Sequence, residues 1–309
     1  MTENREGLGP SALLRRQAFV GCSAALATVF ASAAWQVATR RGVTTGFSPL
    51  ELAMMRYIVP GLIMGLGLGW ARCKPSGLSW TRLGTIVVGG GAPFGLLVAV
   101  GARYAPAAHL SIFLAGTIPL LTACGAWAIY RETLSCGRVV GLVSIFMGIV
   151  TLVMSADVSV LALGDAAFLL AAVGAAAYTL AFRNSGLPPA TGLLVVNVWS
   201  ALVLLPCLFL QVDLARVLAA SRNELLLQLV AQMVLGGIVG PLMYLITIKN
   251  LGSSRAALTS ALPPVVAGIG GQWLLGEPLS DALLAAMFVV AAGVVLASGA
   301  VSAPKKVGA

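Results

Sequence analysis

The chain has 309 residues, of which 59% are hydrophobic and only 9% charged, and its mean hydropathy is +0.98. This composition excludes a soluble globular protein of such length and predicts an integral membrane protein. A formal charge of +9 is compatible with a nucleic-acid partner, but the placement of the basic residues argues against one.

Apolar stretches of about 20 residues follow one another along the chain, and an α-helix needs about that length to cross a bilayer. They are too long for the alternating strands of a membrane barrel. The run after Arg15 and Arg16 is also too long for a signal peptide, so it is interpreted as a retained helix. The sequence therefore predicts an all-α integral membrane protein with ten transmembrane helices, at 17–38, 50–70, 82–102, 107–130, 137–155, 162–182, 190–211, 225–248, 254–275 and 281–300.

The Lys and Arg residues are distributed unequally between the predicted loops. With residues 1–16 and 301–309 as cytoplasmic tails, 13 of the 19 basic residues lie on the cytoplasmic side and five on the other, and Arg56 lies within a helix. The positive-inside rule therefore favours two cytoplasmic termini. The basic character then reflects topology and contact with membrane lipid, not nucleic acid.

Chemistry at a metal or a disulfide is not indicated. The five cysteines are scattered and odd in number, and His109 is the single histidine, so no disulfide framework, metal site or cofactor is expected. No phosphate-binding loop of the P-loop type occurs either, so ATP is not the expected energy source.

Two apolar segments end in the same way. "AIYRETLS" (128–135) and "WLLGEPLS" (273–280) are 145 positions apart, and this shift also superposes Pro119 on Pro264 and Gly148 on Gly293. The match predicts two repeats, at 17–155 and 162–300, with five helices each. Because five is odd, the second repeat crosses the membrane upside down relative to the first, so Glu132 and Glu277 are expected at opposite faces. Such inverted repeats are typical of alternating-access carriers.

The repeats also carry a family resemblance. The stretch from Tyr244 to Ala297, with "FSPLELAMMRYIVPG" (47–61) and "APAAHLSIFLAGTIPLLTA" (105–123) in the first half, resembles the EamA-type repeat of the drug/metabolite transporter superfamily. The resemblance implies a multi-pass carrier in the cytoplasmic (inner) membrane of a bacterium, with the fifth and tenth helices peripheral. One departure is in the first helix, where the family commonly has Trp-Gly and this chain has Phe30-Ala31-Ser32, with Trp35 nearby.

Arg56 lies about six residues into the predicted helix at 50–70, about 9 Å from its outer end. A guanidinium at that depth costs a few kcal/mol or more unless it pairs or faces water. It is a candidate anchor for a substrate carboxylate or phosphate. The alternative is a structural arginine bonded to helix-end carbonyls.

Pro119 and Pro264 are predicted to lie in the middle of helices, where each frees a carbonyl, that of Ala115 and that of Ser260. They are candidate hinges, and the alternative is a static bend capped by nearby hydroxyls.

His109 is a candidate proton relay at the outer mouth, or else an interfacial residue. Polar groups within the spans should face the bundle. The candidate substrate-binding set is therefore Trp35, Arg56, His109, Tyr178, Asn197, Gln232, Tyr244 and Gln272.

The leading hypothesis is a secondary carrier that exports a small organic metabolite, such as an amino acid or a drug-like compound. Its coupling to protons, exchange or simple diffusion stays open, as does a homodimer. The alternative is an integral-membrane enzyme for lipid-linked substrates, which needs a surface cluster of acidic or basic groups that the loops do not provide.

Overall fold

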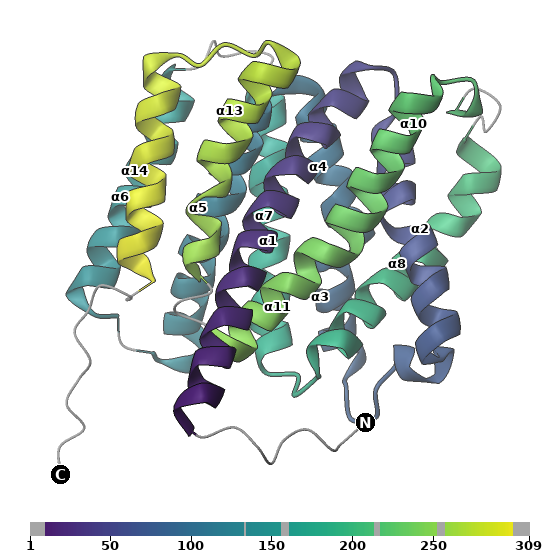
Figure 1. Ribbon diagram of the computed structural model, residues 1–309, viewed down its shortest axis with the longest axis horizontal. Helices are drawn as coiled ribbons and strands as arrows, with labels where there is room; N and C mark the ends of the chain where they lie inside the picture. The colour runs from purple at the N-terminus through teal and green to yellow at the C-terminus, as the bar shows by residue number, and fades with distance from the viewer. Residues whose placement is uncertain (1–9, 133, 156–160, 213–216, 252–256, 299–309) are drawn as a thin grey trace.

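The computed structural model describes residues 10–132, 134–155, 161–212, 217–251 and 257–298, and these residues form a bundle of helices (Figure 1). The first half contains α1 (Pro10–Thr44), α2 (Pro49–Leu68), the 3-10 turn η1 (Trp70–Cys73), α3 (Trp80–Gly90), α4 (Ala92–Tyr104), α5 (Ala107–Tyr130) and α6 (Cys136–Ser155). The second half contains α7 (Leu161–Arg183), α8 (Pro189–Gln211), α10 (Arg222–Leu229), η2 (Val230–Val239), α11 (Gly240–Leu251), the turn η3 (Ala257–Ser260), α13 (Pro263–Leu275) and α14 (Asp281–Ala297).

Eight helical stretches in the described part of the chain are long and apolar enough to cross a membrane. α3 with α4 forms one of them, and α10, η2 and α11 form another. α14 is apolar but has 17 residues, and α13 has 13. The all-helical fold is therefore confirmed, whereas ten full-length spans are not.

The predicted helix at 254–275 is the main difference from expectation. Residues 254–256 lie outside the described residues, 257–260 form η3, and α13 begins only at Pro263. The prediction that Pro264 lies in the middle of a helix is therefore wrong. Pro263 and Pro264 occupy the first turn of α13, where the missing N–H groups have no intrahelical acceptor to lose and the fixed φ angle suits the helix.

The two repeats end α5 and α13 with the same backbone motif. Arg131 and Gly276, which are 145 positions apart, both adopt left-handed φ angles, of 57° and 69°. The next N–H in each case donates to a carbonyl six residues back, from Glu132 to Ala126 and from Glu277 to Gly271. These bonds satisfy carbonyls that a helix end otherwise leaves free. The similarity of the two sequence stretches thus encodes a shared helix cap.

The starts of the following helices correspond as well. The Ser135 hydroxyl accepts from the Arg138 N–H, and the Ser280 hydroxyl accepts from the Leu283 N–H. Glu132 follows the end of α5. Glu277 lies at the start of α5, since one of its carboxylate oxygens accepts from the N–H of Ala107, the first residue of that helix. The 24 residues of α5 span about 36 Å. The two glutamates are therefore at opposite ends of the bundle.

α6 and α14 pack along one another at one edge of the bundle, on the left of Figure 1. Gly141, Gly148 and Gly293 permit this contact, because a Cβ atom on any of them would come within 2.8 Å of an atom of the facing helix. α1 lies nearer the middle and contacts α11, α13 and η2. This arrangement agrees with the peripheral position that the family resemblance implied for the fifth and tenth helices.

A glycine contact between α3 and α7 gives a stability prediction. A Cβ on Gly89 would lie 2.1 Å from the Gly174 carbonyl oxygen, and backbone cannot move aside cheaply. We expect Gly89→Ala to lower the free energy of unfolding by about 1–3 kcal/mol. Gly84→Ala in the same helix, where nothing lies within 4 Å, should leave it unchanged or raise it by up to about 1 kcal/mol, because alanine favours a helix more than glycine does. Equilibrium unfolding in mixed detergent micelles measures both, and equal losses would contradict the packing argument.

Candidate functional site

A buried arginine surrounded by aromatic rings lies where the two repeats meet. The Arg56 guanidinium carbon is 4.0 Å from the centre of the Trp35 ring, 5.4 Å from that of Tyr57 and 6.0 Å from that of Phe94. The repeat-two residues Gln232 and Gly236 complete the group. We call these six residues, Trp35, Arg56, Tyr57, Phe94, Gln232 and Gly236, the arginine cluster. It joins α1, α2 and α4 to η2.

Arg56 is 8% exposed, and its Nε and Nη1 atoms are buried without a hydrogen-bond partner among the described residues. The ring faces offset part of the cost of burying its charge. The Tyr57 hydroxyl lies within reach of the guanidinium, but Nε and Nη1 lack the directed acceptors that a guanidinium ordinarily finds. Two strong donors are thus left available beside an aromatic wall.

Trp35 is held by a ladder of polar side chains. Its Nε1 donates to Gln232 Oε1 at 2.8 Å, and Gln232 Nε2 donates to the Thr39 hydroxyl at 3.0 Å. Gln228 continues the ladder by donating to the Ala38 carbonyl at 2.9 Å and to Glu224 at 3.2 Å. Glu224 in turn pairs with Arg41 at 2.9 Å. Because each amide has partners, the ladder fixes the orientation of the Trp35 ring beneath Arg56.

Gln232 and Gly236 belong to η2, a ten-residue π-helix between α10 and α11. Such helices are rare and occur frequently at functional sites. Pro241, the second residue of α11, lacks the N–H that would bond the Gly237 carbonyl. Asn197 Nδ2 from α8 donates to that carbonyl at 3.3 Å, while Asn197 Oδ1 is buried without a partner among the described residues. Asn197 therefore stabilises the irregular segment and leaves one acceptor unused.

Only a glycine fits at position 236 while the Arg56 guanidinium keeps its place. A Cβ at this residue would lie 2.3 Å from Arg56 Nη1 and 2.6 Å from Trp35 Cδ1. The backbone of η2 thus approaches the cluster as closely as a residue without a side chain allows.

We predict that Gly236→Ala pushes the guanidinium off the Trp35 ring and lowers transport roughly tenfold or more, whereas the fold survives because a side-chain end can shift. Transport into reconstituted vesicles, normalised to inserted protein, provides the measurement. Gly67→Ala in α2, where nothing lies within 4 Å of the added Cβ, is the matched control. A Gly236→Ala protein with wild-type rates would remove the positional role of this residue.

Two further candidates, Tyr178 of α7 and Tyr244 of α11, lie close enough to interact electrostatically, and Tyr178 interacts likewise with Tyr57 of the arginine cluster. Tyr178 is half-buried and stacks on Phe182, with ring centres 5.9 Å apart. Tyr244 is 37% exposed. Of the eight candidates, Trp35, Arg56 and Gln232 are in contact, and Asn197 binds the Gly237 carbonyl in the same helical segment as Gln232.

His109 lies apart from this group. Its Nδ1 is 3.0 Å from an Asp165 carboxylate oxygen, and both residues are buried. Asp165 lies near the start of α7, so the pair joins α5 of the first repeat to α7 of the second. Near this end of the bundle, Arg40 binds Glu277 at 2.7 Å and also donates to the carbonyls of Ala102 and Arg103.

Gln272 does not face the bundle, contrary to prediction. It is exposed on α13 beside Trp273, which is 83% exposed, and shares an arc with Ile269, which is 45% exposed. The reason is that α13 packs on α1 and α5 through the side that holds Ala267, Gly268 and Gly271, whereas Gln272 lies outside this contact. Pro119 lies inside α5, as predicted.

Sequence reasoning missed several members of the site. Gln232 was among the predicted candidates, but Glu224, Gln228 and Gly236 were not, although the four recur at intervals of four residues and so share one helix face. Tyr57 and Phe94 carried no signal, because aromatic residues in apolar helices are ordinary.

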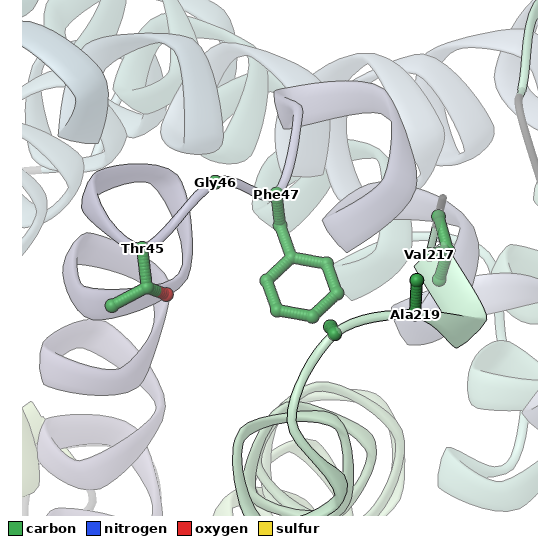
Figure 2. A pocket seen from close by; sticks show the side chains of 6 residues that line it. Thr45, Gly46, Phe47, Val217 and Ala219 are labelled. Carbon is green, nitrogen blue, oxygen red and sulfur yellow. The ribbon is translucent and has the colours of Figure 1, made fainter. Parts of the chain in front are cut away.

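A hollow of about 220 Å³ lies apart from the arginine cluster. It is lined by Thr45, Gly46, Phe47, Val217, Ala219 and Ala220, none of which is charged (Figure 2).

Comparison with known proteins agrees with this description. A bundle of membrane-crossing helices in two repeats, with a polar cluster between them, defines a polytopic membrane protein with the architecture of a carrier. The model of the EamA-like transporter family matches residues 19–154 and 162–299, and the chain belongs to that family. A solved crystal structure with 19% sequence identity superposes with a TM-score of 0.62, covering 89% of this chain and 96% of the other, and supports the fold. No match was found among curated proteins.

Proposed function

We propose that the protein is a secondary transporter that exports a small organic metabolite across the inner membrane of a bacterium by alternating access, with both termini in the cytoplasm. The observation that carries this proposal is the arginine cluster, a charged and polar group buried where the two repeats meet. A rocking carrier needs its substrate site at that junction, because only there do both halves contact the ligand.

The chemistry of the cluster favours a substrate with an anionic group and a planar or apolar body. Arg56 offers two buried donors without acceptors among the described residues, which suit a carboxylate. Trp35 and Phe94 offer ring faces, and the unused Oδ1 of Asn197 can accept from an ammonium or an amide. An amino acid with a large side chain, or a related organic acid, has these groups.

The test is uptake into vesicles that contain the purified protein. The probes are the twenty amino acids and a panel of aromatic and aliphatic carboxylic acids, each radiolabelled and offered against a tenfold excess of the same unlabelled compound inside. We expect saturable exchange of at least one carboxylate and none in protein-free vesicles. Exchange restricted to cationic or neutral compounds would contradict the assigned role of Arg56, and the absence of any exchange would contradict the function.

A further inference from the structure

The side chains of His109 and Asp165 lie in closely packed, apolar surroundings. The two side chains are 8% and 10% exposed, and their neighbours Ala105, Ala108, Leu110 and Phe168 belong to the apolar core. α4 and α7 touch through Gly101 and Gly164 beside the pair, since a Cβ on either glycine would lie within 3.0 Å of the other helix. Burying titratable groups in apolar surroundings costs folding free energy, so such groups are typical of functional sites or of structural ion pairs.

The other charged groups near this end are occupied or exposed. Arg40 of α1 is bound by Glu277 of the α13–α14 link, and the second Glu277 oxygen accepts from the Ala107 N–H, two residues before His109. Arg103 at the end of α4 and Asp281 at the start of α14 are exposed. Among the described residues, Asp165 therefore has His109 as its one ion-pair partner.

The pair also joins the two repeats. α5 belongs to the first repeat and α7 to the second, so a movement that opens this end of the bundle separates His109 from Asp165. A protonated His109 attracts the Asp165 carboxylate as an ion pair, whereas a neutral His109 offers only an uncharged hydrogen bond. The protonation state thus biases the equilibrium between closed and open arrangements of the outer end.

We propose that His109 and Asp165 form a proton-operated latch at the outer end of this carrier, which protonation of His109 holds closed. While that end is open, the ring takes a proton from water on that side, so a ring N–H bond forms, and the imidazolium then closes on the Asp165 carboxylate. When the ring gives the proton back to the same water, the N–H bond breaks and only the weaker uncharged hydrogen bond remains. This proposal rests on the proposed transport function, but its test does not require the substrate.

The first measurement uses the fact that the chain has one histidine. Protein purified through a histidine-free tag and labelled with carbon-13 histidine gives a single ring resonance, whose chemical shift is followed from pH 4.5 to 9. We expect one titration in the wild-type protein, displaced to lower pH in Asp165→Asn because the stabilising carboxylate charge is lost. Asp165→Glu should restore the wild-type midpoint in part. A histidine that does not titrate in this range would overturn the proposal.

The second measurement reports opening of the outer end. Ser111 is fully buried in α5, below His109, so a Ser111→Cys thiol reacts with a membrane-impermeant reagent added outside only when that end opens. Peptide mass spectrometry follows this site without replacing the native cysteines. The labelling rate is divided by that of the same cysteine in the Asp165→Asn background at each pH, which cancels the ionisation of the thiol.

We expect this ratio to be about tenfold higher at pH values above the midpoint of the histidine titration than below it. One charge-assisted hydrogen bond of modest net strength is enough to change the population of the open state by that factor. The control is Glu132→Gln at the opposite end, which should leave the ratio unchanged. A ratio that does not vary with pH would mean that the pair is a structural bond only, even if vesicles transport carboxylates. Conversely, a pH-dependent ratio without carboxylate exchange would leave the latch standing and overturn the substrate assignment.

Discussion

Replacement of Arg56 by methionine is expected to abolish carboxylate exchange while leaving the protein at least as stable as the wild type. A residue that only held the fold together would show the opposite result. The two outcomes separate because Arg56 is buried with two unpartnered nitrogens, Nε and Nη1, among the described residues. Its burial costs free energy that the interaction with the Trp35 ring offsets only in part.

Methionine retains most of the volume against Trp35 and Phe94 and removes the charge. Hydrophobic replacement of a poorly compensated buried charge is often neutral or stabilising by about 1–4 kcal/mol. Loss of two charge-assisted hydrogen bonds to a carboxylate, at about 1.5 kcal/mol each, corresponds to roughly a 100-fold loss of affinity. Thermal unfolding in detergent and vesicle exchange at a substrate concentration below half-saturation measure the two effects.

The matched control is Arg72→Met, which removes an exposed arginine of η1 and should change neither quantity. Arg56→Lys is the informative intermediate, because it keeps the charge but loses the planar fork that binds two oxygens at once. An Arg56→Met protein that unfolds at much lower temperature and still exchanges carboxylates would show that the arginine is structural.

Several features of the fold follow from local sequence signals. The helix cap shared by Arg131 and Gly276 and the serine caps at Ser135 and Ser280 were visible as a 145-residue repeat, because such caps depend on a few adjacent residues. The late start of α13 was not predicted. Pro264 aligns with Pro119, but the additional Pro263 places two prolines in succession, and a first helical turn accommodates them better than a helix interior does.

The pairing of side chains from distant helices was harder to predict. Asp165 is an acid near the start of α7, but its partner His109 is 56 positions away and no local pattern links the two. Gln272 was placed in the interior because a polar group in a span ordinarily seeks protein partners. Its actual exposure depends on how α13 packs against α1 and α5, which is a property of the whole bundle.

The second large effect concerns Glu277 and Glu132, the two equivalent glutamates of the repeats. Replacing each by glutamine should lower the free energy of unfolding by very different amounts. Glu277 binds Arg40 through one oxygen, at 2.7 Å, and the Ala107 N–H through the other, at 3.0 Å. The side chains of Arg40 and Glu277 are 19% and 12% exposed. Glu277→Gln removes the negative charge and one acceptor, so Arg40 stays partly buried without compensation. We expect the free energy of unfolding to fall by about 2–4 kcal/mol.

Glu132 is the corresponding residue of the first repeat, and it pairs with Arg183 at the end of α7, the first helix of the second repeat. Each repeat is thus tied through its glutamate to the first helix of the other. Here the side chains are 53% exposed for Arg183 and 33% for Glu132, so water screens the pair. Glu132→Gln should therefore cost about 0–1 kcal/mol. Its small contribution depends on pH, because the Arg183 hydrogen bond lowers the pKa of the Glu132 carboxyl from its ordinary 4.5.

A lowered pKa in the folded protein means that the stabilisation by Glu132 is present at neutral pH and disappears as the pH falls below the ordinary value. Unfolding of the wild type and of both variants at pH 7 and pH 4 tests these statements together. The difference in stability between wild type and Glu132→Gln should be smaller at pH 4 than at pH 7, whereas Glu277→Gln should be the less stable variant at pH 7 by a wide margin. Equal losses from both substitutions at pH 7 would mean that the difference in burial does not distinguish the two ion pairs, and that the end of the bundle at Glu277 is as open to water as the end at Glu132.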